Sequence, residues 1–319
     1  MKAAIDHGAD AVYVGFRDAT NARHFAGLNF GLAEMRRGVA YAHAARRKML
    51  VAVNTYPSQS NWAHWQQAVD TAAELGVDAL IVADIGVMDY AAARWPNLAL
   101  HLSVQGSATN VDAIEFYAAH FGIQRAVLPR VLSLSQVTSI VRHTDVPVEV
   151  FGFGSLCIMA EGRCLLSGYV TGRSPNTFGA CSPASHVRWQ EQDGRLEVRL
   201  NELLIDRFTD GEPAGYPTIC KGRYRVDGAT CYALEEPTSL STLDILPQLR
   251  DAGIAAIKVE GRQRSAAYVS QATRIMRAAI DACMRDEGDY RPLESWEAGL
   301  ARLSEGSQTT LGAYDRPWS

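Results

Sequence analysis

Short apolar runs alternate with longer helical stretches along the first half of the chain. The apolar runs are too uniformly hydrophobic for strands with one face in water, so they predict strands buried on both faces of a parallel sheet. Several of the stretches between them begin at capping residues, namely Asn61, Asn110 and Ser133. The predicted strands are 11–16, 49–56, 78–84, 98–105, 125–130 and 146–153, and the predicted helices are 32–48, 62–76, 86–95, 110–121 and 133–143.

A seventh strand, 255–261, follows only after about 100 residues that break this rhythm, and it precedes a long helix over 266–285. Seven strands are one fewer than a closed barrel needs, and the opening KAAIDHGAD is helix-like. We therefore expect a (β/α)8 TIM-barrel-like fold whose first strand is missing, with an insertion before the last strand. An open doubly wound sheet is disfavoured, because no GxGxxG follows an early strand. The predicted parts are 1–154 (first part of the barrel), 155–240 (cysteine-bearing insertion) and 241–319 (last strand, helix and tail).

Polar side chains stand at or just after the ends of the predicted strands, where barrel enzymes carry their chemistry. Arg130 and Arg262 could each hold a carboxylate through two parallel hydrogen bonds. Bland roles also exist, since Asp84 could cap the next helix and Arg130 could form a surface ion pair. Arg23 and His24, on the loop after the first strand, could face the same rim. The candidate catalytic residues are Asn54, Asp84, Gln105, Arg130, Glu260 and Arg262.

Five of the six cysteines lie in the insertion, and four of them form a candidate ligand set with wide, irregular spacing. Four thiolates can hold a structural zinc or an iron–sulfur cluster. Zinc ribbons usually present close CxxC pairs, which are absent here, so the spacing favours a [4Fe-4S] cluster. Zinc and unligated buried thiols stay open as alternatives. The proposed ligands are Cys157, Cys164, Cys181 and Cys220, whereas Cys231 in a hairpin-like segment and Cys283 on a helix are left out.

Composition narrows the class of protein. The chain has 319 residues, 47% of them hydrophobic, and a net charge of −4, so it has no overall basic field to gather nucleic acid. No apolar run is long enough to span a membrane, and the first residues lack a signal-peptide core. We expect a cytoplasmic protein, where cysteines serve metal binding or catalysis more often than disulfides. Neither GxSxG nor HExxH occurs, and no histidine context supports Cys164 as a protease nucleophile.

The stretch EVFGFGSLCIMAEGRCLLS (149–167) resembles the signature of the collagenase-like peptidase family of unassigned catalytic type. Further stretches resemble the branch of that family that acts in oxygen-independent ubiquinone biosynthesis, so that the resemblance runs from residue 1 to the C-terminus. The matching signature positions are Glu149, Phe151, Gly154, Ser155, Cys157, Gly162, Cys164 and Ser167. The further stretches are 17–30, 174–184, 214–224, 234–240, 258–271 and 304–314.

This resemblance implies an oxygen-sensitive [4Fe-4S] protein with Cys157, Cys164, Cys181 and Cys220 as ligands. It implies an enzyme component that hydroxylates the ubiquinone precursor ring without O2, in a heterodimer with a UbiV-like protein and together with a UbiT-like lipid carrier. Relatives that hydroxylate RNA point to prephenate as the oxygen donor. For this chain we expect no nucleic-acid partner and no transmembrane segment.

Two departures from the family pattern are visible. The family's opening strand is absent, which puts barrel closure in doubt, and Cys231 is an extra thiol without a matching role. Two other functions stay open at this point: a peptidase, and a non-catalytic assembly subunit whose cluster is structural. The sequence does not say which ring position is hydroxylated, what the cluster does, or how work is divided with the partner.

Overall fold

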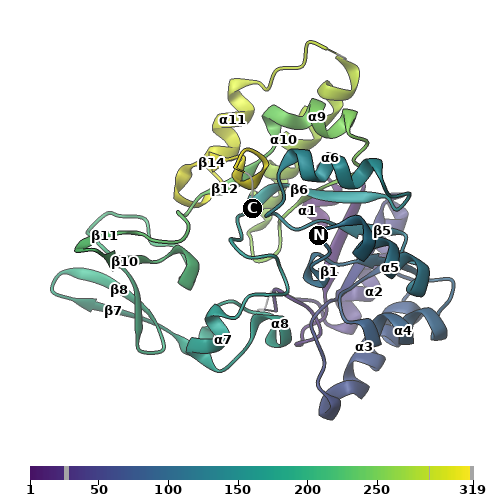
Figure 1. Ribbon diagram of the computed structural model, residues 1–319, viewed down its shortest axis with the longest axis horizontal. Coiled ribbons are helices and arrows are strands. Elements are labelled where there is room, and N and C mark those ends of the chain that lie inside the picture. Colours follow the sequence, from purple (N-terminus) through teal and green to yellow (C-terminus); the bar gives the residue numbers. More distant parts are fainter. Residues whose placement is uncertain (25–28, 287, 317–319) are drawn as a thin grey trace.

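The computed structural model of this protein describes residues 1–24, 29–286 and 288–316. Seven strands of its main sheet run parallel, and all seven overlap the apolar runs that predicted them (Figure 1). The parallel α/β fold is therefore confirmed. The strands are β1 (Ala11–Gly15), β2 (Lys48–Val53), β3 (Ala79–Val82), β4 (Ala99–Leu102), β5 (Arg125–Val127), β6 (Val148–Ser155) and β13 (Ala256–Val259).

The strands follow one another around the sheet in chain order, from β1 to β6 and then to β13. No reversal of order occurs between them, unlike in a doubly wound sheet. The outer edges of β1 and β13 have no strand partner among the described residues. The structure therefore does not confirm a closed eight-stranded barrel.

The helices between these strands pack on one face of the sheet. On β2, Val51 and Val53 belong to the core shared with the helices, whereas Leu50 and Ala52 belong to a separate cluster on the inner face. Successive strand residues point to opposite faces, and all four of these residues are buried. Both faces of the sheet are therefore buried at β2. The helices of this layer are α2 (Leu32–Ala44), α3 (Trp62–Glu74), α4 (Ile85–Arg94), α5 (Val111–Phe121) and α6 (Leu134–Arg142).

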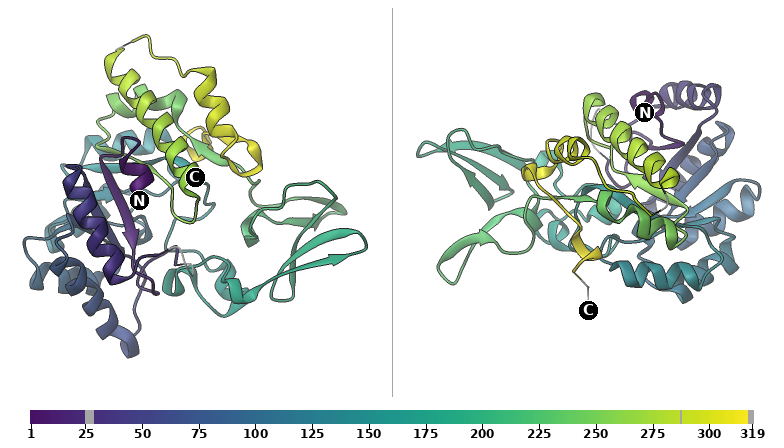
Figure 2. Two further views of the ribbon diagram at one scale, coloured as in Figure 1. Left: turned by 180° about the vertical axis from the view of Figure 1, so that it is seen from behind. Right: turned by 90° about the horizontal axis from the view of Figure 1, so that it is seen from above.

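A second core lies between the end of the sheet and the long helix α10 (Ala266–Arg285). Phe153 of β6 stacks on Tyr268 of α10 with the ring centroids 6.0 Å apart. The short N-terminal helix α1 (Lys2–Ile5) packs beside α10, so the two ends of the sheet share an outer layer (Figure 2). Two more helices cover this end, α9 (Leu246–Asp251) and α11 (Glu294–Ala301).

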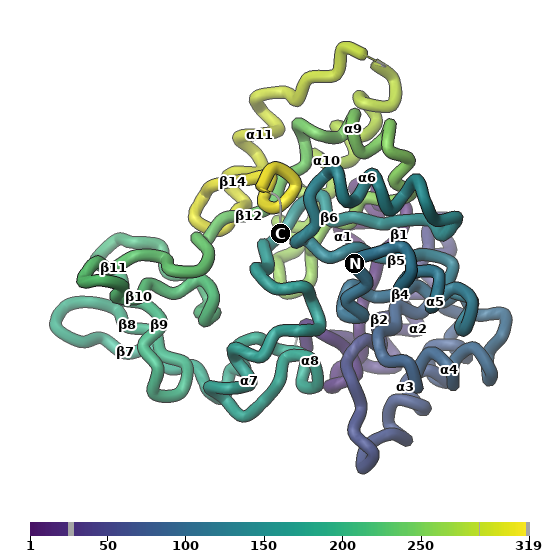
Figure 3. The backbone as a smooth tube through the Cα atoms, viewed as in Figure 1, coloured from purple at the N-terminus to yellow at the C-terminus, as the bar shows by residue number. Residues whose placement is uncertain are grey.

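The cysteine-bearing segment leaves the carboxyl end of β6 and extends to one side of the sheet (Figures 1 and 3). Its outer part has a small core of its own, formed by Val198, Leu200, Ile205 and Phe208. Its elements are α7 (Leu166–Thr171), α8 (Pro175–Phe178), the antiparallel strands β7 (Val187–Gln192), β8 (Arg195–Leu200) and β9 (Leu203–Phe208), and the hairpin β10 (Arg223–Val226) and β11 (Ala229–Tyr232).

The chain returns to the main sheet through β12 (Ser239–Ser241), which pairs antiparallel with the last residues of β6. The two-residue strand β14 (Thr309–Thr310) then pairs with β12. Both ends of the insertion are thus fixed at the carboxyl edge of the sheet. In the described part of the chain, no helix combines the length and the apolar character needed to cross a bilayer.

Candidate functional site

A small cavity lies at the carboxyl ends of the parallel strands. Its volume is about 60 Å³, and it is bounded by residues from both the sheet and the insertion. Five of the six residues chosen from strand ends line it, and so does Arg23. The five are Asn54, Gln105, Arg130, Glu260 and Arg262.

Asp84 and His24 do not line this cavity. The Asp84 carboxylate accepts a hydrogen bond from the Val87 backbone N–H at 3.0 Å and so caps α4. The His24 Nδ1 atom lies 3.3 Å from the side-chain nitrogen of Asn29. The sequence offered the capping role for Asp84 beside a catalytic one, and the contact seen here is the capping one.

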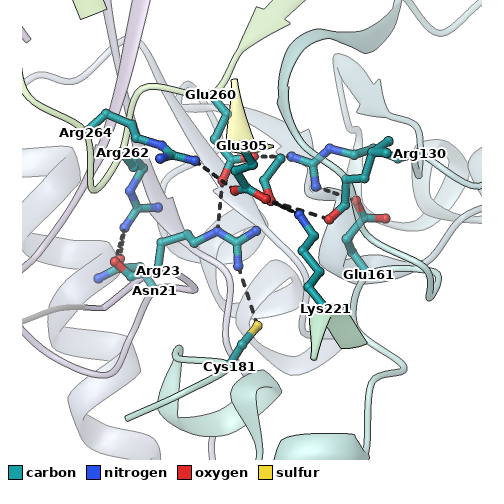
Figure 4. A network of polar contacts seen from close by, with 12 residues as sticks. Asn21, Arg23, Arg130, Glu161, Cys181, Lys221, Glu260, Arg262, Arg264 and Glu305 are labelled. Atoms are coloured by element: carbon teal, nitrogen blue, oxygen red, sulfur yellow. Dashed lines mark hydrogen bonds and ion pairs between the residues drawn. The ribbon is translucent and has the colours of Figure 1, made fainter. Parts of the chain in front are cut away.

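Arg130 is the centre of a buried network of charges (Figure 4). Its Nη1 atom donates to Glu161 Oε1 at 2.9 Å, and its Nη2 atom donates to Glu260 Oε2 at 2.6 Å. The guanidinium also lies 3.6 Å from the centroid of the Phe151 ring, and the Arg130 side chain is only 3% exposed. Two carboxylates from distant parts of the chain therefore meet on one arginine.

Arg23 extends this network toward the thiols. Its Nε atom donates to Glu260 Oε1 at 3.1 Å, and its Nη1 atom donates to the sulfur of Cys181 at 3.8 Å. The path thus runs from Cys181 through Arg23, Glu260 and Arg130 to Glu161, which itself lies between Cys157 and Cys164 in the sequence. Both ends of the network reach the cysteine-bearing segment.

The two carboxyl groups that share Arg130 have opposite pKa shifts. Burial alone would raise the pKa of Glu260, but the guanidinium groups of Arg23 and Arg130 outweigh it and hold the pKa at about 2. Burial raises the pKa of Glu161, because the nearby charge of Arg130 and the weaker opposing contributions do not compensate for the loss of water. The site therefore pairs a firmly ionised carboxylate with a carboxyl group that takes up a proton more readily.

Arg262 differs from Arg130 in its partners. It donates to the side-chain oxygen of Asn21 and, at 3.3 Å, to the backbone oxygen of Arg23. Among the described residues, no carboxylate lies within ion-pair distance of it. Burial lowers the pKa of Arg262 to about 10, which still leaves it charged at neutral pH. Arg262 is half-buried and has no carboxylate partner among the described residues, which makes it a candidate to pair with an anion.

Three polar atoms of residues that line the cavity are also unpaired. Gln105 Oε1, Arg130 Nε and Glu161 Oε2 are buried and have no hydrogen-bond partner among the described residues. Most buried polar groups in native proteins are hydrogen-bonded, so such atoms call for an explanation. A bound ligand or water in the cavity would supply the missing partners.

Three ionisable residues at the cavity were not predicted as site residues: Tyr13, Glu161 and Lys258. Lys258 Nζ bonds Glu149 Oε1 at 2.5 Å and lies 4.1 Å from the centroid of the Tyr13 ring. Tyr13 and Lys258 lie within predicted strands. A polar residue within a strand gives no sign in the sequence that its side chain points into a cavity. Glu161 carried a better signal, because it lies inside the signature stretch between two candidate ligands.

Glu161 is held in place by a close approach of two loops. Gly162 has φ of +90°, and a Cβ atom there would lie 1.9 Å from the Gln105 backbone oxygen. Only glycine fits such a contact. The loop that carries Cys157 and Cys164 therefore presses directly on the rim loop after β4, and a Ser107 hydroxyl donates to the Glu161 backbone oxygen.

The four candidate ligands are half-buried free thiols. Cys181 is close enough to Cys157, Cys164 and Cys220 to interact electrostatically with each of them. Burial raises the pKa of Cys157 to about 12 and also raises the pKa of Cys164 and of Cys220. Without a bound cation, these three groups are therefore neutral thiols.

The donor types of these residues can be compared with those that a metal ion or a cluster needs. Within the described residues, no three His, Cys, Asp or Glu side chains come close enough together to hold one metal ion. A cubane cluster takes one thiolate per iron and so accepts ligands that are farther apart than the ligands of a single zinc. An all-sulfur donor set near a cationic arginine fits a [4Fe-4S] cluster in ligand type and number.

Known proteins resemble this chain over nearly its whole length. A relative from Methanocaldococcus jannaschii described as an uncharacterized protease is 33% identical over 99% of this chain and 70% of its own length. The tRNA hydroxylation protein P of Escherichia coli is 30% identical over 94% of this chain and 70% of its own length. The 23S rRNA 5-hydroxycytidine C2501 synthase of E. coli is 31% identical over 95% of this chain, but only 39% of its own length.

A solved structure titled as the U32 peptidase Mk0906 aligns with 48% of this chain and 65% of its own at a TM-score of 0.39 and 14% identity. The family comparison is more extensive, since the profile of peptidase family U32 matches residues 1–315. The resemblance that the 149–167 stretch indicated is thereby confirmed at the level of the family. This chain belongs to peptidase family U32.

Proposed function

We propose that this chain is the cluster-bearing component of an O2-independent ring hydroxylase. In this proposal Cys157, Cys164, Cys181 and Cys220 hold one [4Fe-4S] cluster beside the rim cavity. The observation that carries the proposal is the contact between Arg23 and Cys181, which brings the thiol centre and the buried rim charges into one site. Two relatives named for RNA hydroxylation support the reaction class.

The residues of the chain suit specific tasks in such a reaction. Arg262 has no carboxylate partner and so binds a carboxylate of the oxygen donor, for which prephenate, a dicarboxylate, is the candidate. Arg130 already contacts two glutamates, so its task is to hold Glu161 and Glu260 in place. Glu161 has an unpaired Oε2 atom and a raised pKa, so its task in this proposal is to hold or transfer a proton. A bound cluster of this kind supplies one-electron transfer or a Lewis-acidic iron.

The size of the cavity limits what it can enclose. A cavity of about 60 Å³ has room for only a few water molecules. Such a space accepts a carboxylate group but not a whole aromatic substrate. The ring to be hydroxylated therefore lies at the mouth of the cavity, between the rim and the insertion.

We further propose the ubiquinone precursor ring as the substrate, with a UbiV-like protein as heterodimer partner and a UbiT-like protein as lipid carrier, as in UbiU-type proteins. The support is the set of matching stretches along the chain and a net charge of −4, which does not favour RNA. An RNA base is the second candidate substrate, because two relatives carry RNA hydroxylation in their names. Peptide hydrolysis is the third, after the family's name.

A deletion strain grown without O2 separates these substrates. We expect hydroxylated quinone to be lost while tRNA and rRNA hydroxylation stay at wild-type levels in mass spectra, and re-expression of the wild-type chain to restore the quinone. Re-expression of Arg262→Met should not restore it. Loss of an RNA modification with normal quinone would favour the second substrate. Peptidase activity that survives removal of iron would overturn the hydroxylase proposal.

A further inference from the structure

Arg23 occupies an unusual position between two parts of the site. A single guanidinium group donates to Glu260 on one side and to the Cys181 sulfur on the other (Figure 4). The Arg23 side chain is 30% exposed, whereas the Glu260 side chain that it contacts is only 10% exposed. No other described residue contacts both a candidate cluster ligand and a rim carboxylate through its side chain.

The backbone around Arg23 is built to hold this contact. The Arg23 backbone N–H donates to the Gly179 oxygen at 2.6 Å, and the His24 N–H donates to the same oxygen at 3.2 Å. Gly179 has φ of +78°, and a Cβ atom there would lie 2.4 Å from the Asn21 backbone oxygen. The loop after β1 is thus clamped against the turn that leads to Cys181.

Arg23 itself adopts a backbone conformation that side chains disfavour. Its φ is +74°, in the left-handed region that non-glycine residues seldom occupy. Such strain persists where the surrounding contacts overdetermine the conformation, and it concentrates at functional sites. The strained backbone at Arg23 therefore accompanies a side-chain position in which the guanidinium contacts both Cys181 and Glu260.

We propose that Arg23 is a positioning residue that raises the reduction potential of the cluster through Cys181 and couples that potential to the charge at the rim. The inference rests on the proposed cluster. Hydrogen bonds and positive charge near the ligand sulfurs stabilise the reduced, more negative form of a cluster, which raises its potential. Glu260 competes for the same guanidinium, so a change of charge at Glu260 alters how strongly Arg23 acts on the sulfur.

The test is a redox titration of anaerobically purified, cluster-loaded full-length protein. We expect Arg23→Met to keep its iron and sulfide and to have a midpoint potential more negative than the wild type. Arg23→Gln, which is neutral but polar, should shift in the same direction. Arg17→Met is the matched control, because Arg17 lies on the same loop and pairs with the exposed Glu34, and it should leave the potential unchanged.

A double-mutant cycle tests the coupling. Glu260→Gln removes a negative charge and should move the potential in the positive direction. In the Arg23→Met background the same substitution should have a smaller effect, because the shared guanidinium is gone. Equal shifts in both backgrounds would overturn the coupling through Arg23.

Other outcomes separate this inference from the proposed function. A wild-type protein without iron and sulfide would overturn the proposed cluster, and this inference with it. A loaded wild type whose potential matches that of Arg23→Met would overturn this inference alone. If Arg23→Met and Arg23→Gln both lost their iron, Arg23 would serve only to hold the Cys181 turn, and the tuning role would be overturned.

Discussion

At the rim, Arg23, Arg130 and two glutamates pair with one another in a buried network, whereas the four candidate thiols of the insertion have no disulfide partner. Arg130 meets Glu161 and Glu260 at 2.9 and 2.6 Å, so both of its terminal nitrogens have a carboxylate partner. The half-buried thiols around Cys181 form no disulfide. The difference indicates that the rim holds its shape through internal contacts, whereas the proposed role of the thiols is to bind a cluster.

The largest expected effect concerns the four thiols, which bind one cluster jointly in the proposed function. Cys157→Ala, Cys164→Ala, Cys181→Ala and Cys220→Ala should each abolish the broad visible absorption of the anaerobically purified protein, because each supplies one iron with its thiolate. Cys231→Ala and Cys283→Ala are the matched controls and should keep it. Full absorption in Cys220→Ala, or its loss in Cys283→Ala, would show that the ligand set is wrong.

The buried network around Arg130 predicts a large loss of stability when this arginine is removed. Arg130→Met leaves Glu161 without its ion-pair partner and Glu260 with Arg23 alone, and breaking a buried ion pair on one side costs about 3–5 kcal/mol. The free energy of unfolding in urea should fall by about that amount. Arg142→Met, at an exposed position on α6, should change it little. A stable Arg130→Met protein would mean that the rim network contributes little to the fold.

Arg262 sharpens the comparison, because this arginine of the rim has no carboxylate partner among the described residues. Arg262→Met should weaken the use of prephenate, raising its KM by roughly ten- to hundred-fold, since a lost charge-assisted hydrogen bond costs about 1.5–3 kcal/mol. The cluster absorption should be unchanged. Arg262→Lys should recover part of the affinity through its charge alone. Wild-type kinetics in Arg262→Met at limiting prephenate would remove the anion site from the account.

The smallest expected effect is on the pH dependence of stability. The pKa of Glu260 is lowered from 4.5 to about 2, so its contribution to the free energy of unfolding is complete above pH 4.5 and is lost as the pH falls toward 2. Glu260→Gln should therefore lose less stability on acidification from pH 7 to pH 3. Glu161 has a raised pKa, so its contribution is lost as the pH rises, and Glu161→Gln should show the opposite change. Thermal unfolding midpoints across this range would measure both.

The parallel strands were predictable because burial on both faces leaves a simple apolar run, as in the ALIV of β3. The rim was partly predictable, since residues at the ends of parallel strands meet at one edge. Asn54, Gln105, Arg130, Glu260 and Arg262 do line one cavity. Each prediction used only chain position and residue type, without any knowledge of partners.

The rest depended on contacts between distant segments. Arg130 and Arg262 looked equivalent in the sequence, and only their partners separate a pairing arginine from an arginine without a carboxylate. Glu161 lies in an irregular loop, where no periodicity shows which way a side chain points. The position of the insertion could not be predicted from the sequence either, because it depends on the pairing of β12 with β6.

The central claim is that the four thiols gathered around Cys181 hold one [4Fe-4S] cluster. It is tested most directly by counting iron, acid-labile sulfide and zinc per chain in protein purified without O2, beside its visible absorption spectrum. The account predicts about four irons and four sulfides per chain, a broad absorption that bleaches on reduction, and no zinc. One zinc per chain without sulfide, or a metal-free protein that still hydroxylates its substrate, would contradict it.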